Sequence, residues 1–168
     1  MAIMHQCISE LLYQCGFRRS EILNLTHTNI DLVNRQIKVT GKGKKERIVP
    51  IGASLTALLE NYIEIAVHLC NKDLNKLLFV TPKGNKLYPE YINRLMAKNG
   101  QKIGMKITPH QLRHSFATHL LDNGAELIAI KELMGHGNLS ATQEYLHSKI
   151  TELKKVYKNA KKTTKISN

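Results

Sequence analysis

Apolar residues recur at helical spacing near the start of the chain. Ile8, Leu11 and Leu12 fall on one side of a helix that we predict over residues 3–14, with Gly16 as its stop. The same periodicity, broken by glycine and proline, predicts further helices over residues 20–25, 55–69, 89–100, 109–122, 125–134, 140–147 and 150–160. The chain is therefore expected to be mainly helical.

The period changes to that of a β-strand between residues 31 and 52. Ile37 and Val39 alternate with polar residues before Gly41-Lys42-Gly43, and apolar residues resume after this glycine pair. The pattern predicts an antiparallel hairpin with a basic tip. We also predict a short strand over residues 77–80.

Together these elements predict an α+β fold, mainly helical, with a small antiparallel sheet near the N-terminus. A chain of 168 residues with 42% hydrophobic residues has the size of one domain and can bury a continuous core. We assign residues 1–160 to this domain. The lysine- and threonine-rich residues 161–168 are expected to form a disordered basic tail.

The charge balance points to a polyanionic partner. Lys and Arg number 25 against 13 Asp and Glu, which gives a net charge of +12. The alternative is a basic surface without a nucleic-acid role, and part of the excess lies in residues 154–165. Nucleic-acid binding is the favoured interpretation of the charge.

The cysteines and the apolar segments exclude other classes of protein. Cys7, Cys15 and Cys70 form an odd, sparse set without a CxxC pair, which argues against a disulfide framework and a zinc knuckle. Glu60 and Glu64 interrupt the most apolar helix, so no segment reaches a transmembrane length. We expect a protein of the reducing cytoplasm that is not exported.

The densest polar cluster lies at the start of the helix predicted over 109–122. His110 and Arg113 are three residues apart and share a face, a pairing that suits a phosphate. The alternative is a helix start with a surface arginine. His110 and His114 have the spacing of metal ligands, but the glutamate of the HExxH motif is missing, so we expect no metal site.

Two other basic motifs precede this cluster. Arg18 and Arg19 stand at a loop-to-helix junction, where Glu21 could orient Arg18; a solvated helix start is the alternative. In the hairpin tip, Lys42 lies between two glycines, which let a cationic side chain approach a backbone phosphate closely. The tip lacks the spacing of a Walker motif, and a charge run is more often a solvated surface.

Tyr145 is the last residue of interest. A single tyrosine is ordinarily a half-buried packing residue. Its position in the sequence after the other polar motifs, and after His136 in a glycine-flanked turn, sets it apart from the other tyrosines.

This ordered set of motifs resembles the catalytic domain of the tyrosine recombinases, also called phage-type integrases, and especially the Xer-like bacterial group. The resemblance spans residues 11–145. Five motifs carry it in the family's order: Gly16 to Glu21, Gly41 to Arg47, Pro109 to His114, Leu133 to His136, and Ser140 to Tyr145. Several independent motifs at family-like spacing are far more specific than any one of them.

The resemblance implies a site-specific recombinase or integrase that cuts and rejoins DNA through a covalent 3′-phosphotyrosyl intermediate, without cofactor or metal. It assigns a role to each motif residue: Arg18, Arg113 and His136 to the non-bridging oxygens, His110 as base, Lys42 as general acid, Tyr145 as nucleophile and Glu21 as orienting group. Four further residues are expected to contact DNA: Arg19, Lys44, Lys45 and Arg47. The implied partners are double-stranded DNA and other recombinase protomers in a tetrameric synapse, at the bacterial nucleoid.

The chain is shorter than typical members of the family that it resembles, and two other functions remain as alternatives. Family members usually carry a helical DNA-clamping domain of about 100 residues before this one, and we expect this chain to lack it and to bind DNA weakly alone. The predicted helix over 150–160 would dock on a neighbouring protomer or face DNA. One rival is a type IB topoisomerase. The other is a non-catalytic module in which the helices over 109–122 and 125–134 form a helix-turn-helix.

Overall fold

The computed structural model describes residues 1–41, 45–70 and 77–135. The helices are α1 (Ala2–Cys15), α2 (Arg19–Asn24), a 3₁₀ turn η1 (His27–Asn29), α3 (Ala53–Cys70), α4 (Pro89–Gln101), α5 (Pro109–Asp122) and α6 (Leu127–Leu133). The strands are β1 (Ile30–Asp31), β2 (Gln36–Thr40) and β3 (Glu46–Pro50). The predicted mainly helical α+β fold is confirmed.

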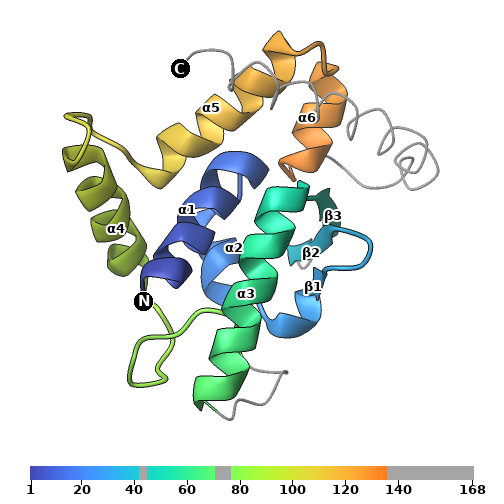
Figure 1. The fold of residues 1–168 in the computed structure, drawn as a ribbon. Helices are drawn as coiled ribbons and strands as arrows, with labels where there is room; N and C mark the ends of the chain where they lie inside the picture. The colour runs from blue at the N-terminus through green and yellow to red at the C-terminus, as the bar shows by residue number, and fades with distance from the viewer. Residues whose placement is uncertain (42–44, 71–76, 136–168) are drawn as a thin grey trace.

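Helix α1 is the centre of the core. It packs against α2, α3, α4 and α5, which surround it in Figure 1. Its apolar side, with Cys7, Ile8, Leu11 and Leu12, is 0% exposed. The helix ends at Gly16, whose φ of 60° is a left-handed conformation that glycine adopts without steric cost. The periodicity thus predicted this helix and its apolar side, and the structure shows that it lies at the centre of the core.

The three strands form one antiparallel sheet in the order β1-β2-β3. Ile37 pairs with Val49 and Val39 with Arg47, so these four residues share a face of the β2-β3 hairpin. Ile37, Val39 and Val49 are buried, which makes this face the inner one. Arg47 therefore extends from the sheet toward the core, a placement that matters for the site below.

The structure differs from the prediction in three places. Residues 77–80 do not form a strand: Leu77 bridges Thr26 and Val80 bridges Lys86 as isolated contacts, so the segment has no continuous ladder. Its apolar character reflects burial of Leu78 instead. Helix α6 is shorter than the predicted 125–134, because Glu126 has extended backbone and acts as its N-cap. Strand β1 and the 3₁₀ turn were not predicted.

Some predictions lie outside the described residues, namely the helices over 140–147 and 150–160 and the tail over 161–168. Cys7 and Cys15 are buried among the apolar side chains of the core. Within the described ranges, no helix combines the length and the apolar character that a bilayer crossing requires.

Candidate active site

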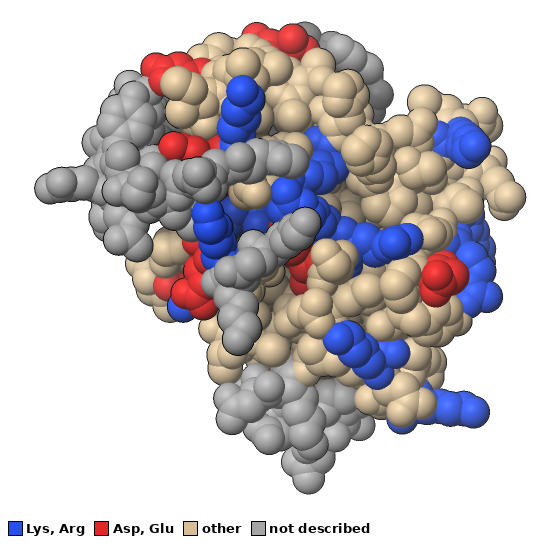
Figure 2. Space-filling view, turned by 180° about the vertical axis from the view of Figure 1, so that it is seen from behind, with Lys and Arg blue, Asp and Glu red and all other residues tan. Residues whose placement is uncertain are grey.

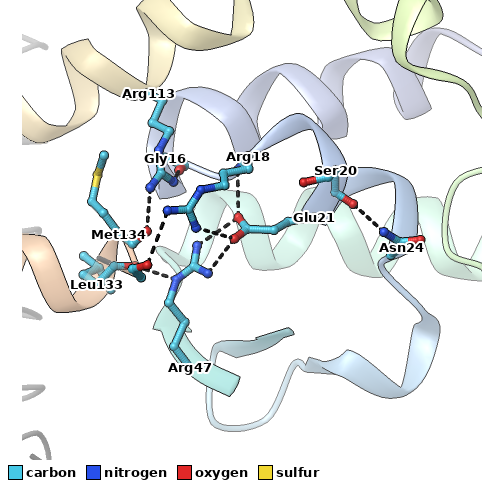
Figure 3. A network of polar contacts seen from close by, with 10 residues as sticks. Gly16, Arg18, Ser20, Glu21, Asn24, Arg47, Arg113, Leu133 and Met134 are labelled. Atoms are coloured by element: carbon cyan, nitrogen blue, oxygen red, sulfur yellow. Dashed lines mark hydrogen bonds and ion pairs between the residues drawn. The ribbon is translucent and has the colours of Figure 1, made fainter. Parts of the chain in front are cut away.

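Glu21 is the hub of the polar network in Figure 3. It lies in the first turn of α2 and is 4% exposed. Its Oε2 accepts a hydrogen bond of 2.7 Å from the backbone N–H of Arg18, half of a capping arrangement, and its Oε1 accepts one of 3.1 Å from Nη1 of the same residue. Because both bonds are local, the start of α2 holds Arg18 and Glu21 together.

Arg47 reaches Glu21 from the sheet. Its Nη1 and Nη2 donate to the two carboxylate oxygens of Glu21 at 2.7 and 2.9 Å, a forked pair. The Arg47 side chain is 10% exposed and its guanidinium stands 6.0 Å from the ring centroid of buried Phe17. Burial raises the pKa of Glu21, but the hydrogen bonds and charges of Arg47 and Arg18 outweigh burial, so this pKa lies below its usual value.

Arg113 is the buried arginine of α5, with 8% of its surface exposed. Its guanidinium donates to the carbonyl of Gly16 through Nη1 and to the carbonyl of Met134 through Nη2, the latter at 2.5 Å. Burial, together with the charges of Arg18 and Arg47, lowers the pKa of Arg113 to about 10, whereas the charge of Glu21 acts in the opposite direction. Arg113 therefore stays charged at neutral pH.

Three consecutive carbonyls at the end of α6 receive these arginines. Leu133 accepts from Arg47 Nε at 2.6 Å, Met134 accepts from Arg113, and Gly135 accepts from Arg18 Nη2 at 3.4 Å. Carbonyls at a helix C-terminus lack helical partners and carry partial negative charge, so guanidinium groups satisfy them well. We call Arg18, Arg47 and Arg113 the arginine cluster. It fixes the backbone that leads directly to residue 136.

The arginine cluster leaves positive charge in excess. Three guanidinium groups face the one carboxylate of Glu21, which gives these four residues a net charge of +2 (three positive minus one negative). Figure 2 shows Lys and Arg side chains gathered near the middle of one face of the molecule. Such a concentration of donors and charge suits a phosphodiester, especially one that gains negative charge during reaction.

The remaining predicted residues are spread around this centre. His110 is exposed in the first turn of α5, three residues before Arg113. Arg19 donates to Oδ1 of Asn93 on α4 at 3.1 Å, and Lys45 is exposed. Lys42, Lys44, His136 and Tyr145 lie outside the described residues.

The histidines of α5 show no metal arrangement. His110 and His114 are exposed, and His119 meets the ring of Tyr13 edge-on at a centroid distance of 6.0 Å. In the part of the chain that the structure describes, no three metal-binding side chains converge.

Arg47 is the residue whose surroundings the sequence analysis missed. We expected it to face DNA, whereas it lies on the inner face of β3 and pairs with Glu21. The signal was present in the alternation of the strand, because residues 47 and 49 share a face and Val49 is apolar.

Comparison with known proteins identifies the family to which this chain belongs. Residues 1–152 match the model of the phage integrase family. The chain belongs to this family. The match covers every residue of the site, including the four outside the described part.

Relatives within the phage integrase family agree with this assignment. Tyrosine recombinase XerD of Staphylococcus aureus is 44% identical over 151 residues, covering 88% of this chain and 51% of the relative. The crystal structure of XerA recombinase aligns with a TM-score of 0.72 and 31% identity, over 94% of this chain and 56% of that one. The chain thus spans about half the length of these relatives.

One similar solved structure is a complex of a recombinase with its substrate. The XerH site-specific recombinase, bound to its difH substrate before cleavage, aligns with a TM-score of 0.70 and 29% identity, over 82% of this chain and 40% of XerH.

Proposed function

We propose that this chain is the catalytic part of a site-specific DNA recombinase that breaks and rejoins DNA through a covalent 3′-phosphotyrosyl link. The observation that carries the proposal is the convergence of Arg18 and Arg113, from α2 and α5, on one network around Glu21. Two arginines held in this way present fixed charge to a phosphate, which lowers the barrier without reorganisation during the reaction.

The chemistry follows from the roles of the remaining residues. The phenolic oxygen of Tyr145 attacks the phosphorus, and His110 takes the phenolic proton, since a phenol with a pKa of about 10 is a weak nucleophile at neutral pH. The bond between phosphorus and the 5′ oxygen breaks, and Lys42 protonates the leaving oxygen. Arg18, Arg113 and His136 hold the non-bridging oxygens, whose charge increases in the transition state.

Rejoining reverses these steps. A 5′ hydroxyl attacks the phosphotyrosyl phosphorus, Tyr145 leaves, and a phosphodiester re-forms, so that the bond energy is conserved and no cofactor or metal is needed. A hydroxyl from a second duplex gives recombination, and one from the same duplex gives restoration. Recombination therefore requires double-stranded DNA and further protomers as partners. Such a protein acts where the DNA is, in the bacterial cytoplasm at the nucleoid.

The test is a nicked DNA substrate that loses a short 5′ fragment after cleavage and so traps the covalent state. The chain in excess over DNA, alone and joined to the N-terminal DNA-clamping domain of a relative, is incubated with it and separated by denaturing electrophoresis. We expect a protein-DNA band that Tyr145→Phe abolishes. Absence of the band in both forms contradicts the proposal and favours a non-catalytic DNA-binding module, whereas plasmid relaxation without exchange between sites indicates a type IB topoisomerase.

A further inference from the structure

Arg47 occupies an unusual position for a charged residue of a strand. It pairs with Val39 across the hairpin and lies on the same inner face as Val49, both buried. Its neighbour Ile48 takes the outer face and is 44% exposed. An arginine on the buried face costs desolvation unless its donors are satisfied, so its partners are the reason for its position.

These partners belong to two segments distant from the sheet. Nη1 and Nη2 bind both oxygens of Glu21 on α2, and Nε binds the carbonyl of Leu133 at the end of α6. All three nitrogens of the guanidinium are thus engaged at 2.6–2.9 Å. A lysine ammonium at the same position has neither the planar fork nor the reach to bind a carboxylate in two places and a carbonyl at once.

We propose that Arg47 is a positioning residue of strand cleavage, which anchors the base of the β2-β3 hairpin to Glu21 and to the end of α6. The hairpin carries Lys42, so Arg47 would set the place of the general acid relative to Arg18, which shares Glu21 with it. This inference rests on the proposed function. Arg47 thereby becomes a structural link in place of a DNA contact. Both of its Nη atoms bind the carboxylate of Glu21, which offsets its charge, whereas Arg113 donates only to neutral carbonyls and keeps its charge available for a phosphate.

The link lies near the two described ends of the hairpin, Gly41 and Lys45. The N–H of Gly41 donates to the carbonyl of Lys45 at 2.7 Å, which closes the described part of the hairpin two residues before Arg47. Only residues 42–44 stand between these two ends in the sequence. A general acid must come within hydrogen-bond distance of the leaving oxygen, and a misplacement of about 1 Å can cost about 100-fold in rate.

The first test distinguishes a defect in protonating the leaving oxygen from a defect in DNA binding or in the attack on phosphorus. Variants R47K and R47Q cleave two nicked substrates under single-turnover conditions with saturating protein: ordinary DNA, and DNA whose scissile 5′-bridging oxygen is replaced by sulfur. A thiolate leaves without a proton, so a fault in delivering the proton does not slow it. We expect a fall of about 10- to 100-fold on ordinary DNA, an unchanged Kd, and recovery to within about threefold of the unaltered protein on the sulfur substrate.

R35N is the matched control. Arg35 is an exposed arginine in the turn before β2, and its φ of 53° is one that asparagine tolerates, so R35N removes one positive charge without disturbing the turn. It should cleave both substrates normally. Three results would each overturn the role of Arg47. R47Q could cleave ordinary DNA at an undiminished rate, it could lose DNA affinity as much as it loses rate, or its defect could persist on the sulfur substrate. Failure of the proposed function is a different result, namely no covalent band from the unaltered chain.

The second test does not depend on cleavage. In R47K, amide hydrogen exchange should accelerate about tenfold or more at Gly41 and at the hairpin amides, while the buried amides of α1 exchange as before. Unchanged exchange in the hairpin overturns the proposal. Faster exchange throughout the core also overturns it, because Arg47 would then support the whole fold and not the hairpin.

Discussion

Gly16 at the end of α1 and Phe116 in α5 lie so close that a β carbon on Gly16 would stand 2.9 Å from Cε1 of the ring and closer still to Cδ1. The same glycine has a φ of 60° and offers its carbonyl to Arg113. The first of the five family motifs therefore begins with a residue that lets two helices approach and supplies a partner for the buried arginine.

Gly16→Ala tests this close approach. The left-handed backbone costs about 1–2 kcal/mol for a residue with a β carbon, and overpacking against Phe116 adds about 1–3 kcal/mol. We expect urea unfolding to show a loss within the sum of these terms. Gly84→Ala is the control, because Gly84 has a φ of 80° but nothing within 4 Å of its β-carbon position, so it should show the backbone term alone. Equal losses in the two variants would mean that Phe116 yields to the added carbon.

Glu21→Gln should change the dependence of stability on pH. The folded pKa of Glu21 is lowered, so the carboxylate stabilises the fold above its ordinary value of 4.5 and this contribution is lost as pH falls below that value. At pH 7 we expect a loss of about 3 kcal/mol, since a buried pair is broken on one side.

The measurement for Glu21 is the free energy of unfolding in urea, compared between the two proteins from pH 7 to pH 3. The difference between unaltered protein and Glu21→Gln should shrink as the solution is acidified. Glu46→Gln serves as control, because Glu46 pairs with Lys38 at the surface, with both side chains 53% exposed, and should cost less than about 1 kcal/mol. A difference that stays constant with pH contradicts the assignment of the lowered pKa.

Much of the fold could be predicted because the glycine and proline breaks fall where the hydrophobic periodicity also changes or ends. The bounds of α5 were obtained from Pro109 at its first turn and the Asn123-Gly124 break, and the structure has the same bounds. The strand predicted over 77–80 failed for the opposite reason. A run of apolar residues indicates that a segment is buried. It becomes a β-strand only if another strand lies alongside to pair with it, and the local sequence does not show whether one does.

The site shows the same division. Local sequence places Arg18 beside Glu21, and the structure contains that pair. The contact between Glu21 and Arg47 joins residues 26 positions apart, and the contact between Arg47 and Leu133 joins residues 86 positions apart. Such contacts depend on how α2, the sheet and α6 pack, and the spacing of motifs carries no distance information for them.

Thr108→Ala tests how the start of α5 is held. Oγ1 of Thr108 accepts a hydrogen bond of 3.2 Å from the N–H of Gln111, and Pro109 follows at the first helical position. Loss of this cap should cost about 1 kcal/mol, measured by urea unfolding, and Thr108→Ser should recover most of it. His110 stands on this first turn and Arg113 follows directly after it. At saturating protein, the cleavage rate of Thr108→Ala should therefore fall by more than the loss of folded protein explains.

The salt dependence of DNA binding separates arginines that hold the fold from residues that meet phosphates. Each phosphate contact removed should lower the slope of log K against log salt by about 0.9. Lys45 is exposed beside the hairpin tip, so Lys45→Gln should lower the slope by about that amount. Arg47→Gln removes the same charge from a side chain paired with Glu21 and should leave the slope unchanged.

The slopes are measured by fluorescence anisotropy between about 50 and 200 mM salt. A reduced slope in Arg47→Gln would return Arg47 to the DNA surface, and an unchanged slope in Lys45→Gln would remove the hairpin tip from it.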